Sequence, residues 1–551
     1  MKNYQKYTTQ HYPIANPTMA WVHKTHLEKP PVWCSVDLRD GNQSLMVPMT
    51  LAQKVEYFNL LVDTGFKEIE IGFPAASETE FAFTRKLIEE NLIPDDVSIQ
   101  VLTQAREHII AKTFKALKGV KNAIVHVYNS TSKAQREQVF AKNKEEIKSI
   151  AVEGAKHVVA YAKKTPGNFR FEYSPESFTG TEPEFALDVC NAVLDVFKPT
   201  AKQKAIINLP ATVEHSLPHV FANQIEWMSN HLKYRQNVLI SLHNHNDRGT
   251  AVAATELGLL AGADRVEGTF FGNGERTGNV DIITLAMNMY ASGVNPLLDM
   301  SNMARIIEVY ERTTGLSVHA RSPYAGDLVF CAFSGSHQDA IAKGLAHQAK
   351  NAPDSWCIPY LPIDPKDVGR ELETCVIRIN SQSGKGGVGY VLEGFGYSLP
   401  AKMREVVGYR VKNLSDKHNK ELSAEEVLTA FKSDFINIEN PYAFDERFEF
   451  REKGYVVDFD VIDTKVGTTT RLRGEGNGSL DAFANAITAH LGLAITDLVY
   501  AQHALGTGST AQAISYIGIC VQGKYSWGAG TDSDITSSSI RALLSAINNS
   551  L

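Results

Sequence analysis

Apolar and polar residues alternate in a repeated order along the first half of the chain. Short apolar runs, such as residues 68–73 and 238–242, are each followed by a turn and then by a longer stretch with helical spacing, such as residues 51–64. Short apolar runs are typical of buried strands, and a 3.6-residue repeat indicates an amphipathic helix. We predict eight strands, at residues 32–38, 68–73, 97–103, 123–128, 170–173, 205–209, 238–242 and 265–270.

Helical stretches separate these strands, the clearest at residues 51–64, 78–91, 182–197 and 250–262. Eight strand–helix units in about 250 residues match the size of a (β/α)8 TIM barrel. An open, doubly wound α/β sheet alternates in a similar way, but the number of units favours the barrel. Sites in such a barrel lie at the carboxyl ends of the strands.

The pattern changes after Pro296. Two helical stretches alternate with loops rich in proline and glycine, the helices at 303–314 and 339–350 and the loops at 358–367 and 381–389. From about Phe435 the residues alternate like half-buried strands, at 448–450, 455–462 and 467–473, followed by helices at 480–491 and 535–547. The predicted fold class is α/β, with an N-terminal arm (1–30), a TIM barrel (31–320), linker subdomains (321–430) and an α+β C-terminal domain (431–551).

Composition narrows the classes of function. The 551 residues carry a net charge of −7 without a basic block, which argues against a nucleic-acid partner. The first 21 residues are polar, and no apolar run is long enough to span a bilayer, so we expect neither a signal peptide nor a membrane partner. The six cysteines form no C-x-x-C pair, which suits a reducing cytoplasm.

Polar residues gather in the loops that follow the first, seventh and eighth strands. These loops contain DLRDGNQ (37–43), SLHNHNDRG (241–249) and GNGERTGN (272–279). The three strands are neighbours in a closed barrel, and residues two apart on a strand share one side. Asp40, His243 and His245 therefore offer a carboxylate and two imidazoles to a divalent ion. The alternatives are a hydrogen-bonded histidine pair and a turn aspartate, and the convergence of three polar loops favours the metal site.

Further polar residues lie where the other strands end. Arg39 is either a fixed cation for a developing alkoxide or an ion-pair partner of Asp37 or of a glutamate. The remaining strand ends carry His126, Glu176, Asn208 and Thr212. Each of these is ordinary alone, so the prediction of a site rests on their facing one mouth.

The three loop motifs resemble those of the metal-dependent Claisen-condensing barrels, which include 2-isopropylmalate, homocitrate and citramalate synthases and, more distantly, 3-hydroxy-3-methylglutaryl-CoA lyase. A fuller match resembles the longer, leucine-regulated 2-isopropylmalate synthase type, at residues 171–182, 208–214, 335–339 and 360–370. The resemblance covers nearly the whole chain from Trp33. Asn244 stands between the two histidines where many relatives have proline, and it lies on the opposite strand face.

The resemblance implies an acyltransferase of leucine biosynthesis. It would condense acetyl-CoA with 3-methyl-2-oxobutanoate (2-ketoisovalerate) and hydrolyse the thioester, which releases 2-isopropylmalate and CoA. The implied divalent ion is Mg²⁺ first, with Mn²⁺ or Zn²⁺ as alternatives and K⁺ as a candidate activator. The implied metal ligands are Asp40, His243, His245 and Asn279.

The resemblance also implies roles for the other site residues. Arg39 would stabilise the alkoxide, and Thr212 would bind the keto acid carboxylate. The isopropyl end would be surrounded by Leu102, His126, Ser174 and Asn208. Proton removal from acetyl-CoA would fall to Glu176 with His337, assisted by Tyr360, the last two reaching the site from the partner subunit of a homodimer.

The C-terminal domain is expected, by the same resemblance, to bind leucine as a feedback inhibitor between two related ββα-like halves. Two glycine-rich segments would let backbone amides approach the leucine carboxylate, through Gly476, Gly478, Gly506 and Gly508. The same segments could be plain turns, or they could mark a two-fold internal repeat.

One further motif is set aside. SGKGGVG (383–389) looks like a phosphate cradle, but Ile379 stands where a Walker A glycine belongs and no clear helix follows. We predict a linker loop there, with a CoA contact as the alternative.

Two other functions stay open at this point. One is a related synthase of the citramalate or homocitrate type, with a smaller or longer keto acid; Leu102 and His126 favour a branched apolar substrate instead. The other is a catalytically silent leucine-sensing protein, which the presence of Asp40, both histidines and Glu176 disfavours.

Overall fold

The computed structural model describes residues 3–352, 354–370, 385–418, 420–445, 455–506, 508 and 511–551. They form two compact units. The first unit comprises Met1–Val329 with Lys366–Gly369, and the second comprises Phe330–Pro365 with Arg370–Leu551. The predicted domain boundaries at residues 30, 320 and 430 remain predictions.

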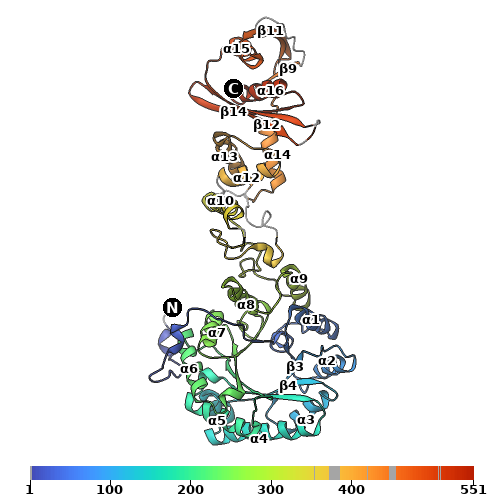
Figure 1. Cartoon of the computed structure of the whole chain (residues 1–551), viewed down its shortest axis with the longest axis vertical. Helices are drawn as coiled ribbons and strands as arrows, with labels where there is room; N and C mark the ends of the chain where they lie inside the picture. The colour runs from blue at the N-terminus through green and yellow to red at the C-terminus, as the bar shows by residue number, and fades with distance from the viewer. Residues whose placement is uncertain are drawn as a thin grey trace. The chain divides into compact units, whose positions relative to one another are not determined.

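Eight parallel strands close into a barrel in the first unit, which confirms the predicted fold class (Figure 1). The strands are β1 (Val32–Ser35), β2 (Glu68–Gly72), β3 (Ser98–Gln104), β4 (Asn122–Ser130), β5 (Asn168–Glu176), β6 (Ala205–Ala211), β7 (Val238–Asn244) and β8 (Arg265–Gly268). β1 pairs with both β2 and β8, which closes the sheet without an exposed edge.

Helices surround the barrel strands (Figure 1). They are α1 (Leu51–Thr64), α2 (Glu78–Glu89), α3 (Glu107–Ala116), α4 (Lys144–Lys164), α5 (Pro183–Phe197), α6 (Pro218–His231), α7 (Ala251–Leu260), α8 (Ile282–Ala291) and α9 (Met303–Thr314). Capping boxes begin α1, through Thr50 and Gln53, and α4, through Asn143 and Glu146. Each box satisfies backbone N–H groups that a helix start leaves free.

Three strands, β1, β2 and β8, end earlier than predicted, β2 by one residue. β1 stops at Ser35 rather than at residue 38, and Asp37–Gly41 forms one π-helical turn. The Asp37 carboxylate holds this turn because it accepts hydrogen bonds from the Tyr57 hydroxyl (2.9 Å) and the Phe270 amide (3.1 Å). β8 stops at Gly268 rather than at residue 270. The backbone therefore leaves the sheet early after β1 and after β8. As a result, Arg39 and Asp40 lie in a turn over the barrel mouth.

The interior of the barrel contains a buried charged layer instead of a purely apolar core. Its centre is the Arg265 guanidinium, which is fully buried. Arg265 donates to Glu68 Oε2 (2.6 Å), Ser241 Oγ (2.8 Å), Glu267 Oε1 (2.9 Å) and Gln100 Oε1 (2.7 Å). Buried charges are tolerated only when they are paired and hydrogen-bonded, and Arg265 meets that condition.

The second unit contains helices α10 (Gly335–Asn351), α12 (Lys385–Gly394), α13 (Ala401–His418) and α14 (Ala424–Phe435). The predicted linker loop at 381–389 is wrong from Lys385 onward, because α12 begins there. Residues 381–384 lie outside the described residues. The glycine-rich composition of this stretch was interpreted as a loop, but the buried Val388 and Leu392 pack into the same core as α13 and α14.

Two antiparallel three-stranded sheets, each followed by a helix, complete the second unit. The first has order β11-β10-β9 and the second β12-β13-β14. Their elements are β9 (Tyr442–Asp445), β10 (Tyr455–Asp463), β11 (Thr468–Gly476), α15 (Ser479–Leu491), β12 (Ile495–Leu505), β13 (Gln512–Val521), β14 (Lys524–Asp532) and α16 (Ile535–Asn548). The strand predicted at 448–450 lies outside the described residues.

The two halves share one apolar core, to which Phe459, Phe483, Ile517 and Leu543 contribute. A two-fold repeat is therefore present as three strands and a helix, but the glycine segments do not mark it. Gly476 to Gly478 join a strand to a helix, whereas Gly506 and Gly508 follow β12 in a connection between two strands.

No helix in the described part of the chain is both long and apolar enough to cross a membrane. Among the described cysteines, Cys34, Cys190, Cys357 and Cys520 are free thiols.

Candidate active site

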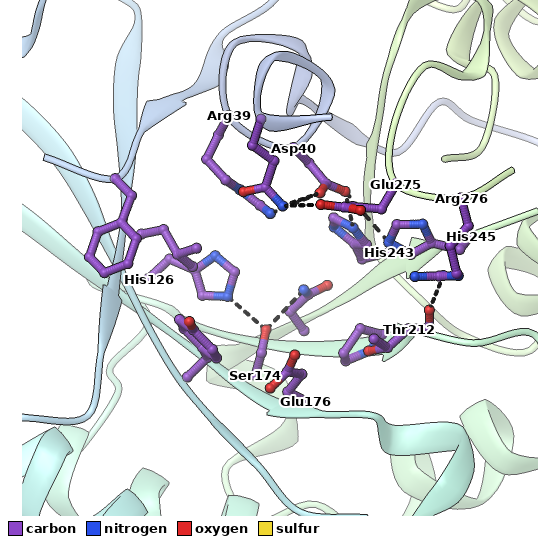
Figure 2. A pocket seen from close by; sticks show the side chains of 16 residues that line it. Arg39, Asp40, His126, Ser174, Glu176, Thr212, His243, His245, Glu275 and Arg276 are labelled. Atoms are coloured by element: carbon purple, nitrogen blue, oxygen red, sulfur yellow. Dashed lines mark hydrogen bonds and ion pairs between the residues drawn. The ribbon is translucent and has the colours of Figure 1, made fainter. Parts of the chain in front are cut away.

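A pocket of about 340 Å³ opens at the carboxyl ends of the barrel strands. Ten of the predicted site residues line it: Arg39, Asp40, Leu102, His126, Ser174, Glu176, Asn208, Thr212, His243 and His245. Figure 2 labels eight of them, all except Leu102 and Asn208, and shows their side chains arranged around one space. The predicted convergence of these residues is thus present in the structure.

Asp40, His243 and His245 form a buried cluster suited to a metal ion. Asp40 Oδ2 lies 3.2 Å from His243 Nε2 and 3.5 Å from His245 Nε2. The early end of β1 brings the carboxylate over the histidines. His243 is in β7 and His245 directly follows the strand, and the two face the same side because they are two residues apart. One carboxylate and two imidazoles are a donor set for a divalent transition ion or Mg²⁺.

Asn279 fits the same cluster. It pairs with His245 in a short β-bridge, and its amide nitrogen donates to the Asn273 carbonyl (2.9 Å). The Oδ1 atom is buried without a hydrogen-bond partner among the described residues, as a carbonyl oxygen reserved for a cation would be. Gly274 makes this position possible, because a Cβ at its φ of +156° would lie 2.2 Å from Asn279 Nδ2.

Asp40 and His245 are in the protonation states that a metal ion needs, whereas His243 must lose a proton before it can bind one. Burial alone would raise the pKa of Asp40, but Arg39 and His243 outweigh it and hold that pKa well below the usual carboxyl range. Burial disfavours the charged form of His243, yet hydrogen bonds with Asp40 and Glu267 raise its pKa to about 9. Burial and the neighbouring His243 lower the pKa of His245 to about 4. Asp40 is therefore a carboxylate and His245 a neutral imidazole at neutral pH.

The barrel interior orients His243. Its Nδ1 lies 2.7 Å from Glu267 Oε2, and Glu267 Oε1 accepts from Arg265 at 2.9 Å. A carboxylate on the far nitrogen of a histidine fixes its tautomer and ring orientation, here with Nε2 toward Asp40.

Arg39 is held between two carboxylates. It donates from Nε to Glu70, and its Nη1 lies 3.2 Å from Asp40 Oδ1. Glu70 is fully buried and also faces His126 Nδ1 at 2.8 Å. Of the two predicted ion-pair partners, the structure shows a glutamate and not Asp37. The guanidinium is consequently a fixed positive charge beside the metal cluster.

The other side of the pocket carries hydrogen-bonding groups above apolar walls. Ser174 Oγ lies 2.7 Å from His126 Nε2 and accepts from Asn208 Nδ2 at 3.0 Å. Thr212 Oγ1 accepts from the Ser177 amide at 2.9 Å. The carboxylate of Glu176 accepts from the Ser130 hydroxyl and reaches the pocket surface.

Two of the predicted catalytic residues lie outside the barrel unit. His337 and Tyr360 belong to the second unit, where both are exposed and their rings stack with centroids 3.9 Å apart. Tyr360 has a φ of +66°, a strained conformation for a residue with a side chain. These two residues are thus a preformed pair, and their catalytic role stays a prediction.

Sequence reasoning missed six lining residues: Gln43, Phe73, Tyr128, Pro210, Glu275 and Arg276. Gln43, Glu275 and Arg276 stand inside the loop motifs quoted above, but no role was assigned to them. Phe73, Tyr128 and Pro210 lie at or beside the ends of β2, β4 and β6, where the rule that sites gather at carboxyl ends could have found them.

Three family models match the chain. HMGL-like matches residues 30–309, the alpha-isopropylmalate synthase post-catalytic domain-like family matches 327–393, and the LeuA allosteric (dimerisation) domain matches 448–551. A 2-isopropylmalate synthase of Helicobacter hepaticus is 58% identical over 99% of this chain and 99% of its own length. One of Desulfitobacterium hafniense is 58% identical over 100% and 98%, and one of Clostridium acetobutylicum is 53% identical over 96% of each chain.

We predict that Asp40→Asn weakens divalent-ion binding by about 100-fold or more, because it removes the only carboxylate of the cluster. His243→Ala should act in the same direction, and both should abolish turnover while the circular dichroism spectrum is unchanged. Isothermal titration of the chelator-treated protein with Mg²⁺ and Mn²⁺ measures the binding. The matched control is Asp63→Asn, an exposed aspartate paired with Arg305. Full activity of metal-stripped protein would contradict the metal role.

Proposed function

The chain belongs to the 2-isopropylmalate synthase family, and we propose that its barrel condenses acetyl-CoA with 3-methyl-2-oxobutanoate and hydrolyses the thioester, which releases 2-isopropylmalate and CoA. The observation that carries this proposal is the meeting of three groups in one pocket. They are the Asp40–His243–His245 cluster, the fixed cation Arg39 and the carboxylate of Glu176. A Claisen condensation of a 2-keto acid needs a Lewis acid, an oxyanion partner and a base.

The metal cluster and its neighbour Arg39 serve the ketone. A divalent ion held by Asp40, His243, His245 and Asn279 would supply Lewis acidity toward the keto and carboxylate oxygens of the substrate. The Arg39 guanidinium, kept in place by Glu70, stabilises the negative charge that develops on the keto oxygen as the new C–C bond forms. Thr212 holds the substrate carboxylate.

Glu176 serves acetyl-CoA. Its carboxylate takes a proton from the acetyl methyl group, with His337 and Tyr360 assisting, and the resulting enolate carbon attacks the keto carbon. Water then cleaves the thioester to a carboxylate and the CoA thiol. Glu176 lies at the end of β5, on the opposite side of the pocket from the metal cluster, so base and Lewis acid address different substrates (Figure 2).

The pocket walls support a branched, apolar keto acid side chain. Leu102 is buried and lines the pocket. His126 is hydrogen-bonded through both ring nitrogens, to Glu70 and to Ser174. Neither is free to receive a second carboxylate, which the homocitrate type of substrate carries. Mg²⁺ is the proposed ion, with Mn²⁺ or Zn²⁺ as alternatives and K⁺ as an activator. The free cysteines suit the proposed cytoplasmic location.

The C-terminal domain is proposed to bind leucine and to contribute to a homodimer. The LeuA allosteric (dimerisation) domain match supports both parts. The proposed contacts are Gly476 and Gly478 before α15 and Gly506 and Gly508 after β12, where backbone amides can approach a carboxylate.

A thiol-release assay with a panel of 2-keto acids tests the proposed reaction. We expect kcat/KM for 3-methyl-2-oxobutanoate to exceed that for pyruvate by about tenfold or more, because the missing methyl groups leave the apolar wall unfilled. Preference for pyruvate or 2-oxoglutarate would move the chain to the citramalate or homocitrate type. No thiol release with any keto acid would leave the silent leucine-sensing alternative.

Mixing two inactive variants tests the shared site. Asp40→Asn lacks the metal ligand and His337→Ala lacks the assisting imidazole, so exchanged chains should regain about a quarter of wild-type activity. Half of randomly mixed dimers are heterodimers, and each has one intact site. Activity is measured after subunit exchange proven by a mass tag. Proven exchange without recovery would mean that one chain builds each site alone.

Gly478→Val tests the leucine site. Gly478 is extended, and nothing lies within 4 Å of a Cβ at this position, so valine fits the chain itself and crowds only a ligand. The leucine concentration for half inhibition should rise at least about fivefold, with little change in the uninhibited rate. The matched control is Gly394→Val, which also meets open space. Unchanged inhibition in Gly478→Val would place the leucine site elsewhere.

A further inference from the structure

Arg276 forms hydrogen bonds that connect the loops after three neighbouring barrel strands, β6, β7 and β8. It lies in the loop after β8 and donates from Nε to Asp247 Oδ1 at 2.8 Å, in the loop after β7. Its Nη2 donates to the backbone carbonyl of Thr212, in the loop after β6, and lies 3.3 Å from Asp247 Oδ2. Figure 2 shows the contact with Thr212 beside the metal cluster.

Asp247 adds a second connection between the loops after β7 and β6. Its Oδ2 accepts from the backbone amide of Glu214 at 3.0 Å. The buried Glu214 carboxylate returns to the loop after β7, where it accepts from the Arg248 amide at 2.6 Å and from the Thr250 hydroxyl. Glu214, two residues after Thr212, is therefore held to the loop after β7 by both its backbone amide and its side chain.

The backbone of Arg276 is strained. Its φ of +57° lies in the left-handed region, which is unfavourable for a residue with a side chain and persists only when surrounding contacts hold it. The side chain supplies those contacts. The hydrogen bond between the two side chains raises the pKa of Arg276. Burial would raise the pKa of Asp247, but the hydrogen bond with Arg276 outweighs burial and lowers that pKa. Both groups stay charged at neutral pH.

Thr212 links this arrangement to the proposed base. Its hydroxyl oxygen accepts from the Ser177 amide at 2.9 Å, and Ser177 directly follows Glu176. A contact at the Thr212 carbonyl and one at its hydroxyl together fix the residue between the loop of the metal ligand Asn279 and the loop of Glu176.

We propose that Arg276, paired with Asp247, is a positioning residue that holds Thr212 where it binds the carboxylate of the 2-keto acid. The inference rests on the proposed function, which gives Thr212 that role. Arg276 also lines the pocket, so the competing explanation is a direct contact between its guanidinium and the substrate.

The test compares Arg276→Gln, Arg276→Lys and Asp247→Asn in the metal-loaded, full-length enzyme. Calorimetry gives the Kd for 3-methyl-2-oxobutanoate without turnover, and steady-state kinetics give KM for each substrate. Arg276→Gln and Asp247→Asn should each raise the Kd and KM for the keto acid about tenfold, the loss of one charge-assisted contact, with KM for acetyl-CoA within about twofold. Arg276→Lys should be intermediate, because an ammonium can serve one of the two partners at a time.

The matched control is Arg305→Gln, which breaks an arginine–aspartate pair with Asp63 on the outside of the barrel and should leave both KM values unchanged. An equal rise in keto acid KM in the control, or wild-type keto acid affinity in Arg276→Gln, would overturn the inference.

Combination with Thr212→Val separates positioning from direct contact. If Arg276 acts through Thr212, the double variant Arg276→Gln/Thr212→Val should bind the keto acid about as weakly as Thr212→Val alone. Losses that multiply would instead assign Arg276 a contact of its own and overturn the inference. The wild-type assay stands apart: an enzyme that binds the keto acid but releases no thiol from acetyl-CoA would contradict the proposed reaction while the binding data still decide the role of Arg276.

Discussion

The rest of the structure depends on the pairing of one buried cation, Arg265, with carboxylates inside the barrel. Its guanidinium binds Glu68 and Glu267 from within a closed sheet, and the pKa of Glu267, which burial would raise, is held well below its usual range by that pairing. Removing one partner of such a buried pair costs about 3–5 kcal/mol, because the other charge is left uncompensated. The pairing therefore holds Glu68 and Glu267 in place, and the site at the carboxyl ends of the strands is built on these carboxylates.

Two buried carboxylates, Glu267 and Glu70, connect the barrel interior to the site residues. Glu267 fixes the His243 ring in the metal cluster, and Glu70 fixes Arg39 beside Asp40 and His126 beneath the keto acid pocket. Residues with different proposed roles, metal binding and oxyanion stabilisation, are thus held by one layer of buried carboxylates. A site on rigid strands with hydrogen-bonded supports keeps its geometry without the substrate, which is what stabilisation of a transition-state charge requires.

Much of this organisation was predictable from the sequence, for identifiable reasons. Strand and helix periods predicted the eight units, and the two-residue spacing of His243 and His245 predicted that both face the same side at the end of β7, where His243 is in the strand and His245 directly follows it. The π-helical turn at Asp37–Gly41 was not predictable, because Tyr57 and Phe270 hold it from distant parts of the chain. The proposed role of Arg276 could not be predicted for the same reason, because its left-handed backbone and its hydrogen-bond partners are visible only in the structure. Helix α12 was missed because its burial against α13 and α14 outweighs its glycines.

The most direct test of the account is a crystal structure of the full chain grown with Mn²⁺ and 3-methyl-2-oxobutanoate, with anomalous diffraction recorded for manganese. The account predicts one anomalous peak in the barrel, about 2–2.3 Å from Asp40, His243, His245 and Asn279 Oδ1, with the keto acid oxygens completing the shell and the Arg39 guanidinium beside the keto oxygen. A manganese peak elsewhere, or a keto acid bound away from these four ligands, would contradict it.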